Sequence, residues 1–505
     1  MKFNTKVWEL EGRREEGRRM KSVRSPPRLE PRRTGNALII AVMLLSLCIL
    51  SFIKARYCPA PYAKLQPVAG VEPVEVSNFV SAKSEEAALA EDEDEEVNAS
   101  ITTQKIVVEK TVISSSKLIC SETSNRSNVC TAEGDIRLQG SSQTITFHPS
   151  LTDREWKTKP YCRKNDAPAM QHIKQWTLKP FPGDGPPPQC TVNYSVPALV
   201  FSIGGFTGNL FHDFTDVIVP LFISSYQFHG EVQFVIPDIK SWWVTKFSLI
   251  LKQLSNYDII DADNDDPDAV RCFPRVIVGL SYHKELGVDP AKTPTGYSVL
   301  EFKEMLRKAY GLERARAAPR GDQWDIRQKP RLLIITRKKT RVFLNERGMT
   351  DMATSVGFDV RVAEPDSSTD LAKFARLVNS ADVMIGVHGA GLTNMVFLPA
   401  GAVLIQVVPM GGLGWLARET FKDPSPDMQI KYLDYHIQAD ESSLSDQYPK
   451  DHPVLKNPSS INNKGWYETS RVYLENQNVR PHLSRLRNTL REALKHLPHG
   501  GRKEE

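Results

Sequence analysis

Short apolar runs rich in β-branched residues alternate with longer amphipathic or mixed segments from about residue 117 onward. Strands separated by segments of helical length are typical of an α/β fold with largely parallel sheets. The runs form two sets, and each set predicts one sheet. The expected strands are 198–203, 232–236, 257–260 and 275–279 in the first set, and 331–336, 359–362, 382–387 and 402–408 in the second.

A shift in composition separates the two sets of strands. Residues 298–313 read as a charged helix, and an Arg- and Pro-rich segment follows to residue 328. Such a segment predicts a boundary between an N-terminal lobe, 117–325, and a C-terminal lobe, 326–480. Residues 481–505 form a closing segment, in which an amphipathic helix begins after Pro481 and ends at Pro498.

An uncharged apolar run, residues 37–53, follows a segment rich in Lys and Arg, residues 1–36. Its length approaches the ~20 residues that a membrane helix needs. A cleaved signal peptide is the alternative, but Lys54 and Arg56 follow where small residues would mark a cleavage site. The basic flank predicts a cytosolic N-terminus, and therefore a single-pass type II protein with everything after residue 53 in the lumen. The short span suits the Golgi apparatus better than the plasma membrane.

The region after the span, residues 54–116, has few aromatic residues and includes the acidic run 91–96, so we expect a luminal stem. Glycosylation sequons begin at Asn98, Asn125 and Asn193, all on the expected luminal side. An oxidising lumen favours disulfides. Cysteines 120, 130, 162, 190 and 272 are candidates whose pairing the sequence leaves open. No Cys-x-x-Cys spacing occurs, which argues against a structural zinc site.

The net charge of +5 has little bearing on the folded region. Much of the basic excess precedes the apolar run, and the remaining chain is close to neutral. Nucleic-acid binding would need a clustered basic face with a recognisable motif. We therefore expect no nucleic-acid partner.

The segment 383–399 runs from an apolar strand into a glycine-rich turn and then into an expected helix. Glycines let the backbone approach a phosphate, and the positive end of a helix dipole attracts its charge. A turn without a ligand is the alternative. An oxyanion hole of an esterase is excluded, because the chain has no G-x-S-x-G. The candidate residues are His388, Gly389, Ala390, Gly391, Thr393 and Asn394.

Two further segments follow expected strands. In 335–346, Arg337 and Arg341 lie among four close cations, which either remain on the surface or bind pyrophosphate oxygens at a strand end. In 204–216, His212 and Asp216 are four residues apart and so share a helical face. Asn209 and Asp213 lie beside them as acceptor-side candidates, and a helix-capping and surface role is the alternative for either Asp213 or Asp216.

Together these segments resemble the plant members of glycosyltransferase family 61. The resemblance runs from about residue 120 to 497. Within it, residues 431–466 are similar to the grass-type xylan-modifying branch, which includes xylan arabinosyltransferases and xylan β-1,2-xylosyltransferases. The carrying sequences are NVCTAEGDIR, GNLFHDFTDVIVPLF, ITRKKTRVFLNE, VHGAGLTNMVFLPAGAVLIQVVP and YLENQNVRPHLSRL.

The resemblance implies an inverting enzyme of the GT-B fold, with two Rossmann-like lobes facing a cleft. It places an Asn-x-x-His-x-x-x-Asp pattern on Asn209, His212 and Asp216. Asp216 is then the expected catalytic base, with Asp213 as a weaker substitute. It places donor binding on Arg337, on Arg341 and on the turn from residue 388 to 394. No metal is expected to be essential, and Asp261-Ala-Asp263 reads as a polar loop.

The expected reaction is transfer of xylose from UDP-xylose to the xylan backbone as a β-1,2-xylosyltransferase. The alternative is a xylan α-1,3-arabinofuranosyltransferase that uses UDP-arabinofuranose. A noncatalytic Golgi scaffold is the alternative from another class. Expected partners are the UDP-sugar, xylan or xylo-oligosaccharide, the Golgi membrane and other xylan-synthesis enzymes.

Overall fold

The computed structural model describes residues 117–148, 154–181, 185–318, 329–366 and 368–498. The expected anchor at 37–53, its flanks and Asn98 lie outside these ranges. Within them, no helix combines the length and apolar character needed to cross a bilayer. The described residues cluster as one compact unit, and two sheets lie within it. The protein is therefore a mixed α/β protein.

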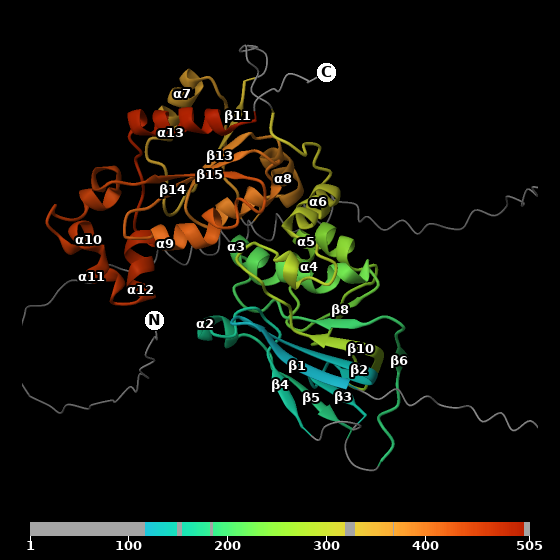
Figure 1. Cartoon of the computed structure of the whole chain (residues 1–505). Coiled ribbons are helices and arrows are strands. Elements are labelled where there is room, and N and C mark those ends of the chain that lie inside the picture. The colour runs from blue at the N-terminus through green and yellow to red at the C-terminus, as the bar shows by residue number, and fades with distance from the viewer. Residues whose placement is uncertain (1–116, 149–153, 182–184, 319–328, 367, 499–505) are drawn as a thin grey trace, which may run out of the picture. The chain divides into compact units, whose positions relative to one another are not determined.

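The first sheet is mixed (Figure 1). Strands β10, β7, β8 and β9 run parallel, and β2 joins β10 in antiparallel fashion. The sheet order is β4-β5-β3-β2-β10-β7-β8-β9, with β1 paired to β2 and β6 to β10. The strands are β1 (Lys117–Ser124), β2 (Ser127–Gln139), β3 (Thr144–Phe147), β4 (Trp156–Thr158), β5 (Trp176–Pro180), β6 (Val192–Asn193), β7 (Ala198–Val200), β8 (Gln233–Ile236), β9 (Ile260–Asp261) and β10 (Arg271–Val278).

The second sheet is parallel throughout, in the order β12-β11-β13-β14-β15. After β11, the chain forms β12 on one side of β11 and then crosses over to form β13 on the other side of β11. Ligands of such sheets bind outside the carboxyl ends of the strands where the order reverses. That place is the end of β11 and β13. The strands are β11 (Arg331–Ile335), β12 (Asp359–Ala363), β13 (Val383–Val387), β14 (Val403–Val408) and β15 (Lys431–His436).

Helices cover both faces of the second sheet. Leu332 and Ile334 pack with α7 and α13, which lie side by side in Figure 1, whereas Leu333 and Ile335 face the larger core. The helices include α2 (Ala167–Met170), α3 (Leu210–His212), α4 (Val219–Ser225), α5 (Ser241–Leu254), α6 (Val299–Tyr310), α7 (Glu346–Val356), α8 (Leu371–Asn379), α9 (Gly414–Ala417), α10 (Pro453–Lys456), α11 (Pro458–Asn462), α12 (Trp466–Thr469) and α13 (Leu483–His496).

Short 3₁₀ and π segments, labelled η, connect these helices. Two of them matter for the site. The π-helix η1 (Asp213–Ile218) leads into α4, and the 3₁₀-helix η4 (Ala390–Phe397) follows β13. Pro220 has no N–H to donate to the carbonyl of Asp216, four residues earlier, so one α-helical bond is absent beside η1. Helices of the π type occur frequently at functional sites.

The expected strands are confirmed, with ends that shift by a few residues, and the helices expected at 298–313 and 480–497 are α6 and α13. The expectation of largely parallel sheets is wrong for the first sheet. Strands β1 to β3 follow one another through short turns, and such turns join antiparallel strands. Strand β15 was not expected, because its sequence KYLDYH lacks a continuous apolar run.

One apolar core joins the two sheets. It includes Leu199 of β7 in the first sheet and Met384 of β13 in the second. Phe214 of η1 contacts Phe397 of η4, with ring centroids 6.0 Å apart, and both rings are buried. Helix η4 also contacts α3, α6 and α8. The segments after β7 and after β13 are therefore packed against each other.

Two disulfides connect four of the cysteines whose pairing the sequence left open. Cys120 bonds to Cys130 across the β1–β2 pair, and Cys190 bonds to Cys272 of β10. Cys162 is free and buried. Asn125 and Asn193 are both exposed, as glycan attachment requires.

The two disulfides should differ in their effect on stability. The Cys190–Cys272 disulfide joins residues 82 positions apart in the sequence, whereas the Cys120–Cys130 disulfide joins residues 10 positions apart. Replacing both cysteines of a pair by Ser removes that loop constraint from the unfolded chain. Loop-closure entropy gives losses of about 4–5 kcal/mol for the first pair and roughly 3 kcal/mol for the second. Chemical denaturation of the full-length chain measures both. A larger loss for the Cys120–Cys130 pair would contradict the prediction.

Candidate functional site

The glycine-rich turn and the cationic segment meet at the crevice between β11 and β13. Gly389 has a φ of 147°, and a Cβ atom there would lie 2.9 Å from Nη1 of both Arg337 and Arg341. A side chain larger than hydrogen would displace one guanidinium or both. Glycine is thus required at this position so that two cations can approach the turn closely.

Neither cation has a carboxylate partner among the described residues. Arg337 donates from Nε to the carbonyl of Thr340 at 2.9 Å, and Arg341 donates from Nη1 to the carbonyl of His388 at 2.8 Å. Burial lowers the pKa of Arg337, and burial together with the nearby Arg337 lowers the pKa of Arg341 to about 9. Glu475 acts on Arg341 only from outside ion-pair distance. Partly buried cations without a carboxylate in direct contact favour binding of an anion.

His388 belongs to the same cluster. Burial, with Arg341 and Arg337 nearby, lowers the pKa of His388 to about 3, so the imidazole is neutral near pH 7. Its backbone N–H donates to the carbonyl of Val407 at 2.9 Å. The side chain is therefore held beside two cations in its uncharged form.

Several polar atoms at this turn are unsatisfied. Thr393 Oγ1, Asn394 Oδ1 and Arg341 Nε are buried without a hydrogen-bond partner. Helix η4 opens with a bond from the N–H of Leu392 to the carbonyl of Gly389, and the N–H groups of a first helical turn lack intrahelical acceptors. Buried polar groups are almost always bonded in folded proteins, so these atoms indicate a ligand site.

A distant segment holds the cationic loop in place. The N–H of Arg341 donates to the carbonyl of Gln477 at 2.9 Å, and the N–H of Leu344 donates to the carbonyl of Val479 at 2.8 Å. Arg341 adopts a left-handed φ of 57°, which is strained for a residue with a side chain. The loop is thus fixed by residues located more than 130 positions downstream.

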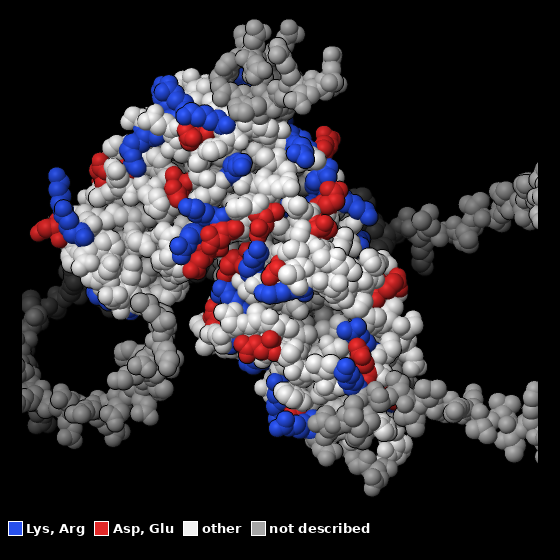
Figure 2. All heavy atoms as spheres, viewed as in Figure 1, with Lys and Arg blue, Asp and Glu red and all other residues white. Residues whose placement is uncertain are grey.

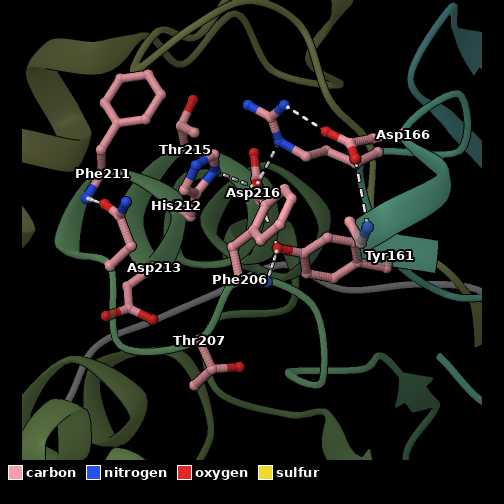
Figure 3. Close-up of polar contacts among 12 residues, drawn as sticks. Tyr161, Asp166, Phe206, Thr207, Phe211, His212, Asp213, Thr215 and Asp216 are labelled. Atoms are coloured by element: carbon pink, nitrogen blue, oxygen red, sulfur yellow. Dashed lines mark hydrogen bonds and ion pairs between the residues drawn. The ribbon is translucent and has the colours of Figure 1, made fainter. Parts of the chain in front are cut away.

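The second group of polar residues surrounds Asp216 (Figure 3). Asp216 is fully buried in η1, and its Oδ2 accepts from His212 Nδ1 at 2.8 Å. The spacing of four residues correctly predicted their shared face. Because an ionised carboxylate only accepts, Nδ1 of His212 carries the proton, and a neutral ring then has its lone pair on Nε2. The side chain of His212 is 18% exposed, whereas that of Asp216 is 0% exposed.

Two partners of Asp216 were not foreseen from the sequence. Tyr161 donates its hydroxyl to Oδ2 at 3.0 Å, and Arg163 donates from Nε at 2.8 Å. Burial raises the pKa of the Tyr161 hydroxyl, and the negative charge of Asp216 raises it further. A Cβ atom on Gly205 would meet the ring of Tyr161 at 2.3 Å, so the glycine allows the contact. The segment PYCR contains no recognisable motif, and only the fold brings it to η1.

The other two acceptor-side candidates are engaged in local structure. Asn209 caps α3 and accepts from the N–H of Phe211 at 3.1 Å. Asp213 is buried and accepts from the N–H of Gly208 at 3.1 Å and from Nε1 of Trp243 at 2.9 Å. Burial raises the pKa of Asp213. Only Asn209 caps a helix, whereas Asp213 and Asp216 are buried, so a helix-capping and surface role for either Asp is wrong. The side chains of Asn209 and Asp213 hold the turn that leads to His212.

Aromatic rings connect the two groups. The ring of Phe211 lies 5.5 Å from that of His212, and Phe421 lies 5.8 Å from Phe211 and 5.8 Å from His388. Phe421 is buried between them. The imidazole of His212 and the anion-binding turn therefore belong to one region of the protein.

Within the described ranges, no group of three or more His, Cys, Asp or Glu residues is arranged to hold a metal ion. The Asp-x-Asp sequence at 261–263 forms a polar loop. Asp261 accepts from the N–H of Asp263 at 3.1 Å, and Asp263 pairs with Lys174 at 2.8 Å. On the face in Figure 2, acidic and basic side chains are interspersed. Together, the cations beside Gly389 can bind a diphosphate, and the His212–Asp216 pair can place an imidazole base in the same region.

The sequence is similar to those of known glycosyltransferases. A family model described as Glycosyltransferase 61 covers residues 210–405. The rice (Oryza sativa subsp. japonica) alpha-1,3-arabinosyltransferase XAT3 is 46% identical over 76% of this chain and 66% of its own length. The rice beta-1,2-xylosyltransferase XYXT1 is 40% identical over 75% of this chain and 84% of its own length. The Arabidopsis thaliana xylan glycosyltransferase MUCI21 is 38% identical over 79% of this chain and 83% of its own length.

The chain thus spans just under two thirds of the length of the arabinosyltransferase relative. Among solved structures, the iron-containing heptosyltransferase TibC, from Escherichia coli, matches 59% of this chain and 78% of its own chain. The TM-score is 0.24 at 14% identity. A likeness at that level carries no argument about fold or chemistry.

Replacing Arg341 by Gln should separate anion binding from stability. Loss of one charged hydrogen-bond donor should weaken UDP binding about 10- to 100-fold. The free energy of unfolding without nucleotide should stay the same or rise, because a partly buried unpaired charge is removed. Calorimetric titration and chemical denaturation measure the two effects. Lys338→Gln is the matched control, since Lys338 is exposed and paired with Glu364. Equal losses of UDP affinity in both variants would refute the assignment.

Proposed function

This chain belongs to glycosyltransferase family 61, and we propose that it transfers a pentose from a UDP-sugar to xylan. The observation that carries the proposal is the pairing of two features. Two guanidinium groups without an ion-pair partner among the described residues lie beside Gly389, and a His–Asp pair lies in the same region. A group transfer from a diphosphate needs both an anion site and a proton acceptor.

In the proposed reaction, a xylan hydroxyl attacks the anomeric carbon from the face opposite the diphosphate. The new C–O bond forms as the bond from carbon to the diphosphate oxygen breaks, and UDP leaves with that electron pair. The configuration inverts. Arg337, Arg341 and the N–H groups that open η4 stabilise the charge that develops on the leaving group.

We assign acceptance of the hydroxyl proton to Nε2 of His212 rather than to Asp216. The side chain of Asp216 is 0% exposed; its Oδ2 accepts three hydrogen bonds, and its Oδ1 is buried without a partner. It holds His212 in the tautomer that leaves Nε2 free and stabilises the imidazolium that forms. Asp216 is then a positioning residue, and Tyr161 and Arg163 position it in turn.

The donor sugar has two candidates. Arabinofuranose is favoured by the rice alpha-1,3-arabinosyltransferases XAT3 and XAT2, at 46% and 43% identity. Xylose, which the sequence analysis put first, is supported by the rice beta-1,2-xylosyltransferases XAX1 and XYXT1, each at 40% identity. We therefore place UDP-arabinofuranose first and UDP-xylose second. Xylan as the acceptor is supported by the named substrate of MUCI21.

The wider setting is part of the proposal. Two sheets carrying the donor and acceptor groups suit a GT-B arrangement of two Rossmann-like lobes. The apolar run at 37–53 with its basic flank supports a single-pass type II protein of the Golgi membrane. The cations around Gly389 support transfer without an essential metal. A purely structural scaffold would have no need for partly buried unpaired guanidinium groups or for a His–Asp pair.

Replacing His212 by Gln tests the proton acceptor. Removing a general base should lower kcat about 10²- to 10⁴-fold. UDP affinity should stay unchanged, because His212 does not contact the anion site in the proposal. Steady-state kinetics with xylo-oligosaccharides and calorimetry with UDP measure the two quantities in the full-length protein.

The control for this test is His229→Asn, which changes an exposed histidine with a left-handed φ of 51°. Asp216→Asn is less informative alone, since it also leaves Arg163 without its buried partner. Transfer by His212→Gln at the rate of the unmodified protein would return the base role to another group.

Product analysis identifies the donor. The full-length protein is incubated with xylo-oligosaccharides and either UDP-arabinofuranose or UDP-xylose, with EDTA present in parallel reactions. We expect an α-1,3-arabinofuranosyl product, and equal rates with and without EDTA. A β-1,2-xylosyl product would select the second candidate. UDP binding without transfer or donor hydrolysis from either sugar would favour the scaffold.

A further inference from the structure

His388 is held by a buried polar chain that runs across the second sheet. Nδ1 of His388 lies 2.7 Å from Nε2 of Gln406 on β14. The hydroxyl of Tyr432 on β15 donates to Oε1 of Gln406 at 2.6 Å. Gln406 is 0% exposed, although β14 otherwise presents an apolar core strand. An amide in such a place is costly unless its hydrogen bonds are satisfied.

The two hydrogen bonds fix the direction of the chain. Because the tyrosine hydroxyl donates to the amide oxygen, the amide nitrogen faces His388 and donates to Nδ1. A ring nitrogen that accepts carries no proton. The proton of a neutral imidazole is then on Nε2, and Nε2 has no hydrogen-bond partner among the described residues.

The surroundings keep the ring neutral. Arg337 and Arg341 both lie close enough to disfavour a third positive charge, and burial acts in the same direction. A neutral imidazole carries one proton, either on Nδ1 or on Nε2. The hydrogen bond from Gln406 to Nδ1 selects the Nε2–H tautomer, and Tyr432 determines how Gln406 is oriented.

We propose that Gln406 and Tyr432 are positioning residues that hold His388 as the Nε2–H tautomer, so that it donates a neutral hydrogen bond to the diphosphate of the donor. The inference rests on the proposed function, since it needs a diphosphate at this turn. The wrong tautomer would present a lone pair to phosphate oxygens and repel them. This chain of hydrogen bonds from Tyr432 through Gln406 to His388, called the relay below, thus adds a directed N–H to the site without adding charge.

A mutant cycle with UDP as the probe tests the relay in the full-length protein. Gln406→Leu should weaken UDP binding about five- to tenfold, and Tyr432→Phe about two- to fivefold, by calorimetry. Both effects should vanish in a His388→Ala background, because the two residues act through His388. A merely structural role would lower affinity equally in both backgrounds, and that result would overturn the proposal.

Two substitutions of His388 report which nitrogen matters. His388→Gln keeps a neutral N–H near the position of Nε2, whereas His388→Asn replaces only the Nδ1 side. We expect the Gln variant to bind UDP more tightly than the Asn variant. Equal affinities, or the reverse order, would contradict the assigned tautomer.

Matched controls separate this inference from the proposed function. Gln233→Leu removes a buried strand glutamine of the first sheet, and Tyr435→Phe removes a hydroxyl on β15 that donates to Glu441 instead. Neither should change UDP affinity. If the unmodified protein binds UDP but Gln406→Leu binds it equally well, only the relay fails. If the unmodified protein does not bind UDP, the proposed function fails and the relay falls with it.

Discussion

The contact between Phe214 and Phe397 determines where the chemistry can occur. Phe214 lies between His212 and Asp216 on η1, and Phe397 closes the helix that begins at the glycine-rich turn. Two buried rings at this distance form part of a close-packed core, which resists displacement. The distance between the imidazole and the anion-binding turn is thus a property of the apolar core. Motions that moved the two sheets apart here would expose aromatic surface.

Charge is organised differently on the two sides of that contact. Around Gly389, the guanidinium groups have no ion-pair partner among the described residues, and neighbouring hydroxyl and amide oxygens lack hydrogen-bond partners. Around Asp216, three donors converge on Oδ2, and Oδ1 is buried without a partner. In the proposed function, the residues around Gly389 receive the negative charge of the ligand, and Asp216 orients the base. A single buried carboxylate then serves the proposed reaction without contacting a sugar.

Much of this could be read from the sequence, and the reasons for the misses are physical. Strand periodicity located the parallel strands, and the spacing of His212 and Asp216 predicted their contact. The family resemblance placed the glycine turn together with Arg337 and Arg341, and the structure brings the three into contact at the carboxyl ends of neighbouring parallel strands. Tyr161 and Arg163 escaped notice, because their role comes from a contact across more than 50 residues. The burial of Asp216, and so its supporting role, depends on η1, which residue spacing alone does not distinguish from an α-helix.

The bonds from Arg341 and Leu344 to Gln477 and Val479 have a consequence for biosynthesis. The cationic loop gains these supports only after residues 477–479 have been synthesised. A nascent chain that ends before residue 477 carries the arginines but not the groups that set their backbone. In the proposed function, nucleotide binding therefore depends on a segment that is made more than 130 residues after the arginines themselves.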